Sequence, residues 1–187
     1  GRMGIHFTRT DHNLTFSSVA VGGWLREHCG VWSANKRVPV SIREATPEIM
    51  ERFLYSYGLG DGTTHSIGRR YITSSKKLAD DLHEMLCKLG RGRKIRRAAL
   101  AGSRTVNQHG REFERRHDVW VINDPGEPVD SNVRKRNVER VRYRGLVYCV
   151  STPHETIMVR RNGCAMWSGN SAHVLFVCDE AGGISHT

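Results

Sequence analysis

The chain has 187 residues, which is enough for one ordinary domain or two small ones. Its 29 Lys and Arg against 19 Asp and Glu give a formal net charge of +10 at pH 7, and its 38% hydrophobic and 26% charged residues are too balanced for wholesale disorder. Most of the basic residues are arginines, whose planar guanidinium suits bidentate recognition of phosphate. The composition therefore predicts a polyanionic partner.

Several other classes of protein are not expected. No stretch approaches the roughly 18 apolar residues of a membrane span, and the first residues lack the apolar core of a signal peptide. The five cysteines are an odd number and form no C-x-x-C pair, which argues against a disulfide framework and a structural zinc site. We expect a soluble, cytoplasmic protein with reduced thiols.

Two segments share the order strand, serine pair, helix. Residues 14–16 precede Ser17-Ser18 and an apolar segment that ends at Gly30, and residues 69–73 precede Ser74-Ser75 and a segment that ends at Gly90. In the second segment one helical face carries Leu78, Leu82, Met85, Leu86 and Leu89, which predicts a helix from about residue 75 to 89. We expect a duplicated unit whose first copy begins before residue 1.

A further helix is predicted between these two segments. Thr46 is a suitable N-cap, Pro47 suits the first helical position, and Gly62 is a natural stop. Its apolar side is expected to comprise Ile49, Met50, Phe53, Leu54 and Tyr57. Ser56 and Gly60 lie four residues apart, and this small-residue pair would let another helix approach closely.

After Gly90 the chain becomes basic and then rich in predicted strands. Residues 91–97, RGRKIRR, carry charges that repel one another unless they meet phosphate, which favours contact with a DNA backbone. A polar stretch to about residue 114 precedes a strand at 117–122 and a turn at 123–126. Alternation from Val138 predicts a solvated β-meander, and the apolar residues 173–180 predict a buried parallel strand that belongs to another domain.

The helix that ends before Gly62 carries the segment LYSYGLGDG, residues 54–62. This segment resembles the nine-residue helix motif of the LAGLIDADG homing endonucleases. Residues 36–39, KRVP, and residues 71–90, YITSSKKLADDLHEMLCKLG, also look like intein-borne members of that family. The resemblance covers roughly residues 14 to 90, although Tyr55 and Gly58 depart from the usual small and apolar occupants.

The resemblance implies a site for cleaving DNA. In this family two motif helices pack through small side chains, here Ser56 and Gly60, and the acid that closes each helix holds a divalent ion against the scissile phosphate. Asp61 is that acid, and Mg²⁺ is the expected ion because hard oxygen ligands favour it. One complete motif is present, so the second carboxylate is expected from a missing N-terminal segment or a second chain. An isolated GDG would by itself indicate only a glycine-rich turn.

Double-stranded DNA is the partner that this resemblance and the charge pattern both predict. The expected backbone contacts are Arg69, Arg70, Arg91, Arg93, Lys94, Arg96 and Arg97. The plainer interpretation, a solvated basic face, carries more weight for Arg160 and Arg161.

A second set of residues resembles the C-terminal splicing region of inteins. It comprises the strand VYCV at 147–150, His154, the turn VRRNG at 159–163, and Gly169-Asn170-Ser171. The resemblance implies that Asn170 cyclises to a succinimide and cleaves its own peptide bond, while Ser171 receives the upstream segment. Taken alone, an Asn-Ser pair indicates a surface turn and a strand cysteine a small core residue.

The remaining splicing assignments follow from the same resemblance. Cys149 occupies the strand position that supplies the initiating thiolate in one intein class, and Ser168 stands where that class prefers threonine. Gly169 replaces the histidine that often precedes the final asparagine, so another group must assist proton transfer. His154 is the candidate for that role.

The tail VLFVCDEAGG, residues 174–183, resembles a Walker B strand and the packaging ATPase of phage terminase large subunits. Asp179 would then support Mg²⁺ and Glu180 would polarise the attacking water. The sequence contains no phosphate-binding G-x-x-x-x-G-K-[ST] loop, so ATP hydrolysis by this chain is not expected. The tail is interpreted as the beginning of the host protein, which places the chain in a bacterial cell that carries a phage or prophage.

Together these patterns predict an α/β (α+β) fold in four segments. Residues 1–40 would be the tail of a first LAGLIDADG repeat, 41–130 the second repeat with a basic DNA-binding extension, 131–170 an all-β Hint-type splicing segment, and 171–187 the start of the host protein. The predicted activity is site-specific DNA cleavage with autocatalytic splicing chemistry, although the chain is not expected to splice without an N-terminal half. The alternatives are a degenerate DNA-binding relative without catalysis and a terminase ATPase fragment interrupted by an inactive intein.

Overall fold

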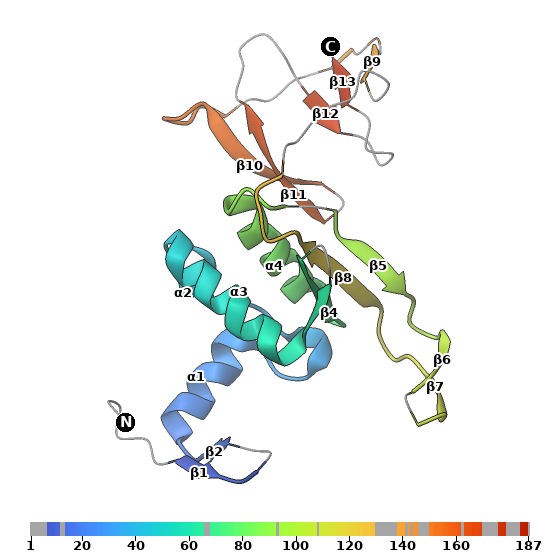
Figure 1. Ribbon diagram of the computed structural model, residues 1–187. Coiled ribbons are helices and arrows are strands. Elements are labelled where there is room, and N and C mark those ends of the chain that lie inside the picture. The colour runs from blue at the N-terminus through green and yellow to red at the C-terminus, as the bar shows by residue number, and fades with distance from the viewer. Residues whose placement is uncertain are drawn as a thin grey trace.

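The computed structural model combines helices with antiparallel sheets, and its largest sheet has four strands (Figure 1). The structure describes residues 7–11, 14–65, 68–92, 94–107, 109–129, 138–140, 142, 144–145, 150–161, 163–169, 176–178 and 184–186. The predicted fold class, a mixture of α and β structure, is therefore confirmed.

Among the described residues, four α-helices occur in the first half of the chain. They are α1 Val19–Cys29, α2 Val40–Arg43, α3 Pro47–Asp61 and α4 Lys76–Lys88, with a 3-10 turn at Ser33–Asn35 between the first two. Pro47 occupies the start of α3 and Gly62 its C-cap, as predicted, but Gly62 has an extended backbone rather than a left-handed one.

The central sheet has the strand order β3-β4-β8-β5, and each neighbouring pair is antiparallel. Its strands are β3 Gly62–His65, β4 Gly68–Thr73, β8 Val119–Asp124 and β5 Arg96–Ala99. The other strands are β1 Phe7–Arg9, β2 Leu14–Phe16, β6 Arg104–Val106, β7 Glu112–Glu114, β9 Val138–Arg140, β10 Thr156–Arg161, β11 Cys164–Gly169, β12 Phe176–Cys178 and β13 Ile184–His186.

Helix α4 is the most deeply buried helix of the described chain. Leu78, Leu82, Met85 and Leu86 are at most 3% exposed, as their predicted common face requires. Ser75 caps the helix by accepting a hydrogen bond from the backbone N–H of Leu78, 3.1 Å away, and Gly90 ends the segment with a φ of +72°. Burying each of these side chains stabilises the fold by about 1.5–3 kcal/mol.

The core forms where α3 and α4 pack on one face of the central sheet. Met50 and Leu54 of α3, Tyr71 of β4 and Ile122 of β8 join the α4 side chains in a single buried cluster. The Tyr71 hydroxyl donates to the Asp124 carboxylate at 3.2 Å. Burial, followed by the charge of Asp124, raises the pKa of Tyr71 to about 12, so the phenol stays a neutral donor at physiological pH.

A buried carboxylate ties α4 to the segment before α3. Asp81 is 0% exposed, and its Oδ2 accepts a hydrogen bond from the backbone N–H of Val38 at 3.0 Å. Its Oδ1 pairs with Arg43 Nη1 at 3.0 Å and with the ammonium of Lys77. Lys77 and Asp81 lie four residues apart on α4 and form an ion pair there, and Asp81 also holds a second segment of the chain in place.

The predicted internal repeat is visible in the local structure. Strands β1 and β2 form an antiparallel hairpin before α1, just as β3 and β4 form one before α4. Ser18 accepts a hydrogen bond from the N–H of Val21 at 3.3 Å, which matches the capping role of Ser75. The two helices differ in burial, because no residue of α1 is buried and Trp24 and Leu25 are 43% and 41% exposed.

Several predicted boundaries are wrong. No strand is predicted for the basic run, but its last two residues, Arg96 and Arg97, begin β5, which pairs with β8. The polar stretch that follows contains the antiparallel hairpin β6-β7, and β8 continues through Asn123 and Asp124, the beginning of the predicted turn. Pairing with β4 explains the longer strand, since Asn123 and Asp124 lie opposite Arg70 and Arg69.

The described part of the tail does not form the predicted parallel strand. Phe176–Cys178 pairs antiparallel with β13, and it is β13 that runs parallel to β9. The apolar composition of this segment is typical of a parallel strand, but composition does not specify the partner. Asp179 and Glu180 lie outside the described residues.

Among the described residues, no helix has the length and apolar character needed to cross a bilayer.

The buried carboxylate leads to a prediction about stability. Asp81→Asn keeps the size of the side chain but removes the charge that faces Arg43, whose side chain is only 19% exposed. We expect the free energy of unfolding to fall by about 2 to 3 kcal/mol, measured by urea denaturation. Lys77→Gln is the matched control, because it breaks one pair of the same carboxylate at an exposed position and should cost about 0.5 kcal/mol or less. Equal losses in the two variants would contradict this account.

Candidate nucleic-acid interface and cleavage sites

Asp61 lies at the C-terminal end of α3, where its side chain is 52% exposed. At this end of the helix the dipole is negative, so the carboxylate does not stabilise α3. The last turn of α3 contains no basic residue that would offset its charge. Lys36 Nζ lies 3.5 Å from Asp61 Oδ2 and offsets part of this cost. The carboxylate is thus accessible to solvent at a position that the helix dipole disfavours.

The face of α3 that was predicted to receive another helix is open to solvent. Ser56 and Gly60 are exposed, and a Cβ at Gly60 would meet no atom within 4 Å. Tyr55 and Leu59 on the same helix are 54% and 71% exposed. Within the described residues, no helix covers this face, which we call the open α3 face (Tyr55, Ser56, Leu59 and Gly60).

The two residues of the motif that depart from the family pattern have local explanations. A Cβ at Gly58 would lie 3.2 Å from Cδ of Arg69 and 3.5 Å from the ring of Tyr71, so glycine allows β4 to approach α3 closely. The guanidinium of Arg69 lies 4.7 Å from the centre of the Tyr55 ring. Tyr55 therefore holds a cation that the sequence assigns to DNA.

Arg69 and Arg70 point to opposite faces of the sheet. Arg69 lies on the side of α3, whereas the neighbouring Arg70 donates from Nε to Asn123 Oδ1 at 3.3 Å. The strand register places Arg70, Ile72, Asn123 and Arg96 on the face that α3 and α4 leave uncovered. We call these four residues the outer sheet face, and Ile72 is 45% exposed there.

The basic run is divided between the core and the surface. Arg91 is only 7% exposed, pairs with Glu51 at 2.9 Å and lies 3.4 Å from Asp124. Its predicted role as a DNA contact is therefore not supported, because its charge is already paired inside the fold. Lys94, Arg96 and Arg97 are exposed, and Arg93 lies outside the described residues.

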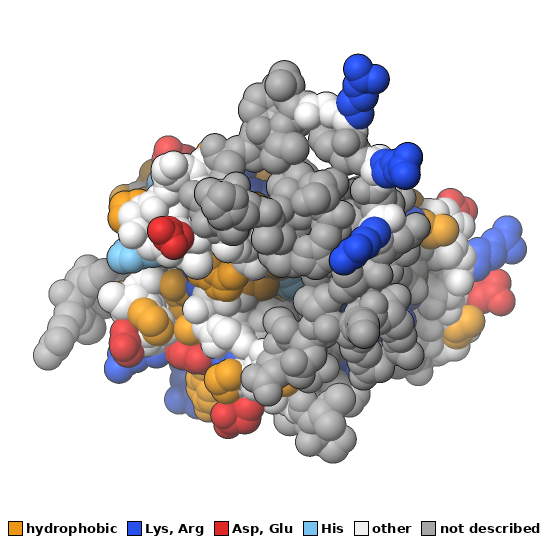
Figure 2. Space-filling model, turned by 90° about the horizontal axis from the view of Figure 1, so that it is seen from above, with side chains coloured by type: hydrophobic (Ala, Val, Ile, Leu, Met, Phe, Trp, Pro, Cys, Tyr) orange, Lys and Arg blue, Asp and Glu red, His pale blue; other side chains and the backbone are white. Residues whose placement is uncertain are grey.

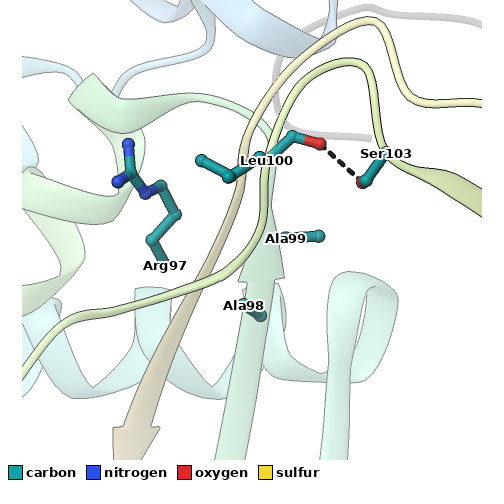
Figure 3. A pocket seen from close by; sticks show the side chains of 5 residues that line it. All are labelled: Arg97, Ala98, Ala99, Leu100 and Ser103. Carbon is teal, nitrogen blue, oxygen red and sulfur yellow. Dashed lines mark hydrogen bonds between the residues drawn. The ribbon is translucent and has the colours of Figure 1, made fainter.

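Arg97 lies beside an aromatic ring on the central sheet. Its guanidinium is 5.9 Å from the centre of the Trp120 ring, and its Nη1 is 3.3 Å from Asp118 Oδ2. Arg97 also lines a shallow depression of about 440 Å³ with Ala98, Ala99, Leu100 and Ser103, where the Ser103 hydroxyl donates to the Leu100 carbonyl at 2.6 Å (Figure 3).

The hairpin β6-β7, which the sequence does not predict, extends from this depression. Phe113 lies opposite Thr105 and alternates with Arg111 and Arg115, whereas Glu112 and Glu114 point to the other face together with Arg104, which lies opposite Glu114. The guanidinium of Arg115 lies 5.8 Å from the centre of the Phe113 ring. Phe113 is 44% exposed. One face of the ribbon (Thr105, Arg111, Phe113 and Arg115) is thus cationic and aromatic.

Basic side chains also project from the end of the molecule that carries the hairpin β10-β11 and the C-terminus. Figure 2 shows this end with Lys and Arg side chains standing out singly among Asp, Glu and hydrophobic side chains. Much of the surface in this view belongs to residues that are not described, and the view therefore does not locate a basic patch.

The predicted splicing residues are only partly described. His154 is exposed in a turn just before β10, where Glu155 N donates to the Thr152 carbonyl at 3.1 Å. Cys149, Asn170 and Ser171 lie outside the described residues. Strand β11 ends at Gly169, directly before Asn170, and Gly169 pairs with Thr156 at the beginning of β10. His154 and the predicted cleavage position thus belong to the same end of this hairpin.

Comparisons with known proteins gave two partial matches, and no family model matches the chain. The chain is 34% identical over 109 residues to the DNA-directed RNA polymerase subunit beta C-terminal section of Stigeoclonium helveticum, covering 56% of this chain and 10% of that protein. It is 33% identical over 63 residues to the ATP-dependent Clp protease proteolytic subunit of Chlamydomonas moewusii, covering 30% of this chain and 6% of that protein. The chain spans about a tenth or less of these relatives, and neither is named as an endonuclease, a splicing protein or a terminase.

Proposed function

We propose that this chain is part of an intein that carries a LAGLIDADG-type homing endonuclease. The observation that carries the proposal is the placement of Asp61, an exposed acid at the end of a helix whose small-residue face is open. The motif LYSYGLGDG predicts both the terminal acid and the small-residue face. An ordinary glycine-rich turn at the end of a helix would require neither of them. The proposed location is the bacterial cytoplasm, on the resemblance of the tail to a phage terminase.

The two partial matches support an inserted module. A segment that moves between genes would match unrelated hosts over a small share of their length, and the two relatives are named as a polymerase subunit and a protease subunit. Neither name supports a terminase host. That part of the proposal depends on the resemblance of residues 174–183 alone.

The open α3 face is the proposed docking site for a second motif helix. Small side chains at Ser56 and Gly60 let two helix backbones approach, and Leu59 and Tyr55 offer apolar surface beside them. A second helix in this position would bring its own terminal acid close to Asp61. Either a further segment of the protein or a second chain could supply it.

The described residues provide only part of a metal site. Asp61 offers one hard oxygen ligand, but no group of three His, Cys, Asp or Glu side chains in the described chain could hold a metal ion. We therefore propose Mg²⁺ only for the paired helices, where it would stabilise charge on the cleaved phosphate. In the single chain Asp61 pairs instead with Lys36.

Two surfaces form the proposed DNA interface. The outer sheet face supplies Arg70 and Arg96, with Lys94 nearby in sequence, and the β6-β7 ribbon supplies Arg111 and Arg115 around Phe113. Arg97 is also exposed, but it lies beside Trp120 on the opposite face of the edge strand β5. A two-stranded ribbon fits the major groove of duplex DNA, and arginines bind phosphates along its backbone. Arg91 is left out of this interface because its charge is paired inside the fold, and Arg69 because it lies over Tyr55 on the α3 side of the sheet.

A second candidate function is DNA binding without cleavage. The Asp61–Lys36 ion pair favours it, because a carboxylate paired with an ammonium has less attraction for a metal ion. The two functions share the DNA interface and differ in the consequence of removing Asp61.

Duplex DNA binding should depend steeply on salt. Replacing three exposed cations of the basic run by glutamine, Lys94, Arg96 and Arg97, should flatten the plot of log K against log [salt] by up to about 0.9 for each phosphate that is no longer neutralised. Fluorescence anisotropy with a labelled duplex at several salt concentrations measures the slope.

A control with the same reduction in charge distinguishes a local interface from net charge. It replaces three exposed cations of the helices by glutamine, namely Arg26, Arg52 and Lys77. The slope of this control should stay close to that of the parent chain. If both triple variants flatten the slope equally, the basic run has no special place on the DNA surface.

Cleavage should require the carboxylate of Asp61. In the presence of the second motif helix and Mg²⁺, Asp61→Asn should lower strand cleavage by orders of magnitude and leave DNA affinity nearly unchanged, because shape is kept while an anionic ligand is removed. Asp118→Asn is the control, since Asp118 pairs with Arg97 at the sheet edge. Cleavage by Asp61→Asn at the parent rate would favour DNA binding without nuclease chemistry.

The splicing segment should release its own tail. Cyclisation of Asn170 needs only its side-chain amide and a polarised carbonyl, so incubation of the chain should slowly free a fragment that begins at Ser171. Asn170→Ala should abolish this release. Intact-mass spectrometry should show the fragment 171–187 and a partner chain lighter by one water than a product of hydrolysis. Cleavage elsewhere, or release that persists in Asn170→Ala, would refute the splicing assignment.

A further inference from the structure

Trp32 is an exposed tryptophan with a strained backbone, in the loop between α1 and α2. Its φ of +66° and ψ of 156° lie in a region of backbone conformation that is essentially restricted to glycine. The residue is 82% exposed, so burial of the indole ring does not compensate for this strain. Strained residues of this kind are concentrated at functional and ligand-binding sites. The loop around Trp32 is therefore a candidate site.

Hydrogen bonds and one close approach fix the backbone of this loop. Arg37 Nε donates to the His28 carbonyl at 3.1 Å, so the residue that ends the loop also satisfies the last turn of α1. Within the loop, the backbone N–H of Asn35 donates to the Trp32 carbonyl at 3.3 Å. Gly30 allows the chain to return, because a Cβ there would lie only 2.1 Å from the Asn35 carbonyl oxygen. The loop thus holds the backbone of Trp32 in place while the residue itself stays exposed.

The end of the loop lies next to Asp61. The Ser75 hydroxyl donates to the Lys36 carbonyl at 2.5 Å, which ties the loop to the N-cap of α4. Lys36 Nζ lies 3.5 Å from Asp61 Oδ2, and Figure 1 shows the loop between α1 and α2 beside the C-terminal end of α3. Four residues span at most about 14 Å, so Trp32 lies near the residue that pairs with Asp61. The indole and the carboxylate thus belong to one region of the surface.

An exposed indole ring in this setting suits a base of DNA. Every base has a π face on which an aromatic side chain stacks, and the half-exposed Lys36 carries a charge that attracts phosphate. The net charge of +10 favours a polyanion over a neutral protein surface as the partner. Stacking requires a base step that opens, and pyrimidine–purine steps such as TA unstack most easily.

We propose that Trp32 stacks on a base of duplex DNA, at a flexible step close to the phosphate that Asp61 faces. This inference rests on the proposed DNA binding and adds to it a residue that selects deformable sites. Because the loop is already fixed, the contact requires little further ordering of the backbone. The contact is uncharged, so it raises affinity without changing the number of phosphates that are neutralised.

The test measures the affinity of the full chain for two labelled duplexes at one salt concentration, one rich in TA steps and one made of stiff A-tracts. We expect the parent chain to prefer the TA duplex, and Trp32→Leu to bind that duplex about tenfold more weakly, the effect of removing one stacked base. Trp32→Phe keeps an aromatic face and should recover most of the affinity. Trp24→Leu is the matched control and should bind as the parent does, because Trp24 is an exposed tryptophan that already stacks on His28, with ring centres 4.5 Å apart.

Two further measurements separate stacking from other roles of Trp32. The salt slope of binding should stay at the parent value in Trp32→Leu, whereas neutralising the basic run flattens it. Trp32→Gly should lose the same affinity yet unfold at the parent temperature or a few degrees higher, because glycine relieves the strain. Failure of the parent chain to bind either duplex overturns the DNA function itself. Parent-level affinity and TA preference in Trp32→Leu overturn the stacking role alone, and a change of oligomeric state in that variant would then identify Trp32 as a protein-docking residue.

Discussion

The position of α4 is the constraint on which the rest of the described fold depends. One side of this helix buries Leu82, Met85 and Leu86 against the central sheet, and Asp81 holds the segment before α3 through two polar partners, the backbone N–H of Val38 and the guanidinium of Arg43. The opposite side satisfies the edge of β11 through His83 and Cys87. A helix with two buried sides cannot shift toward one partner without leaving polar groups of the other unsatisfied.

The same arrangement leaves two other surfaces exposed. Because α3 and α4 pack on one face of the central sheet, Arg70 and Arg96 remain on the face away from the core. The side of α3 that does not face the sheet keeps Ser56 and Gly60 open. The proposed DNA surface and the proposed helix-docking surface are thus both consequences of how one layer of helices covers one side of a sheet.

The candidate sites were predictable to different degrees. Asp61 is a candidate because of a local motif, and the structure shows an exposed carboxylate at the end of α3. The role of Arg91 did not follow from the sequence, because its partners Glu51 and Asp124 lie far from it along the chain. A run of basic residues does not show which of them pair with acidic side chains inside the fold. His83 belongs by sequence to a polar helix face, and nothing local indicates that β11 would meet it.

The sequence by itself determined the elements whose signals are local. The capping serine and left-handed glycine around α4, the proline at the start of α3 and the strand that precedes each serine-capped helix all follow from side chains within a few residues of one another. The tertiary structure alone decided which cations are free, which strand pairs with the basic run and where the C-terminal hairpin docks. Those outcomes depend on contacts between distant residues, and composition and periodicity do not specify partners at such separations.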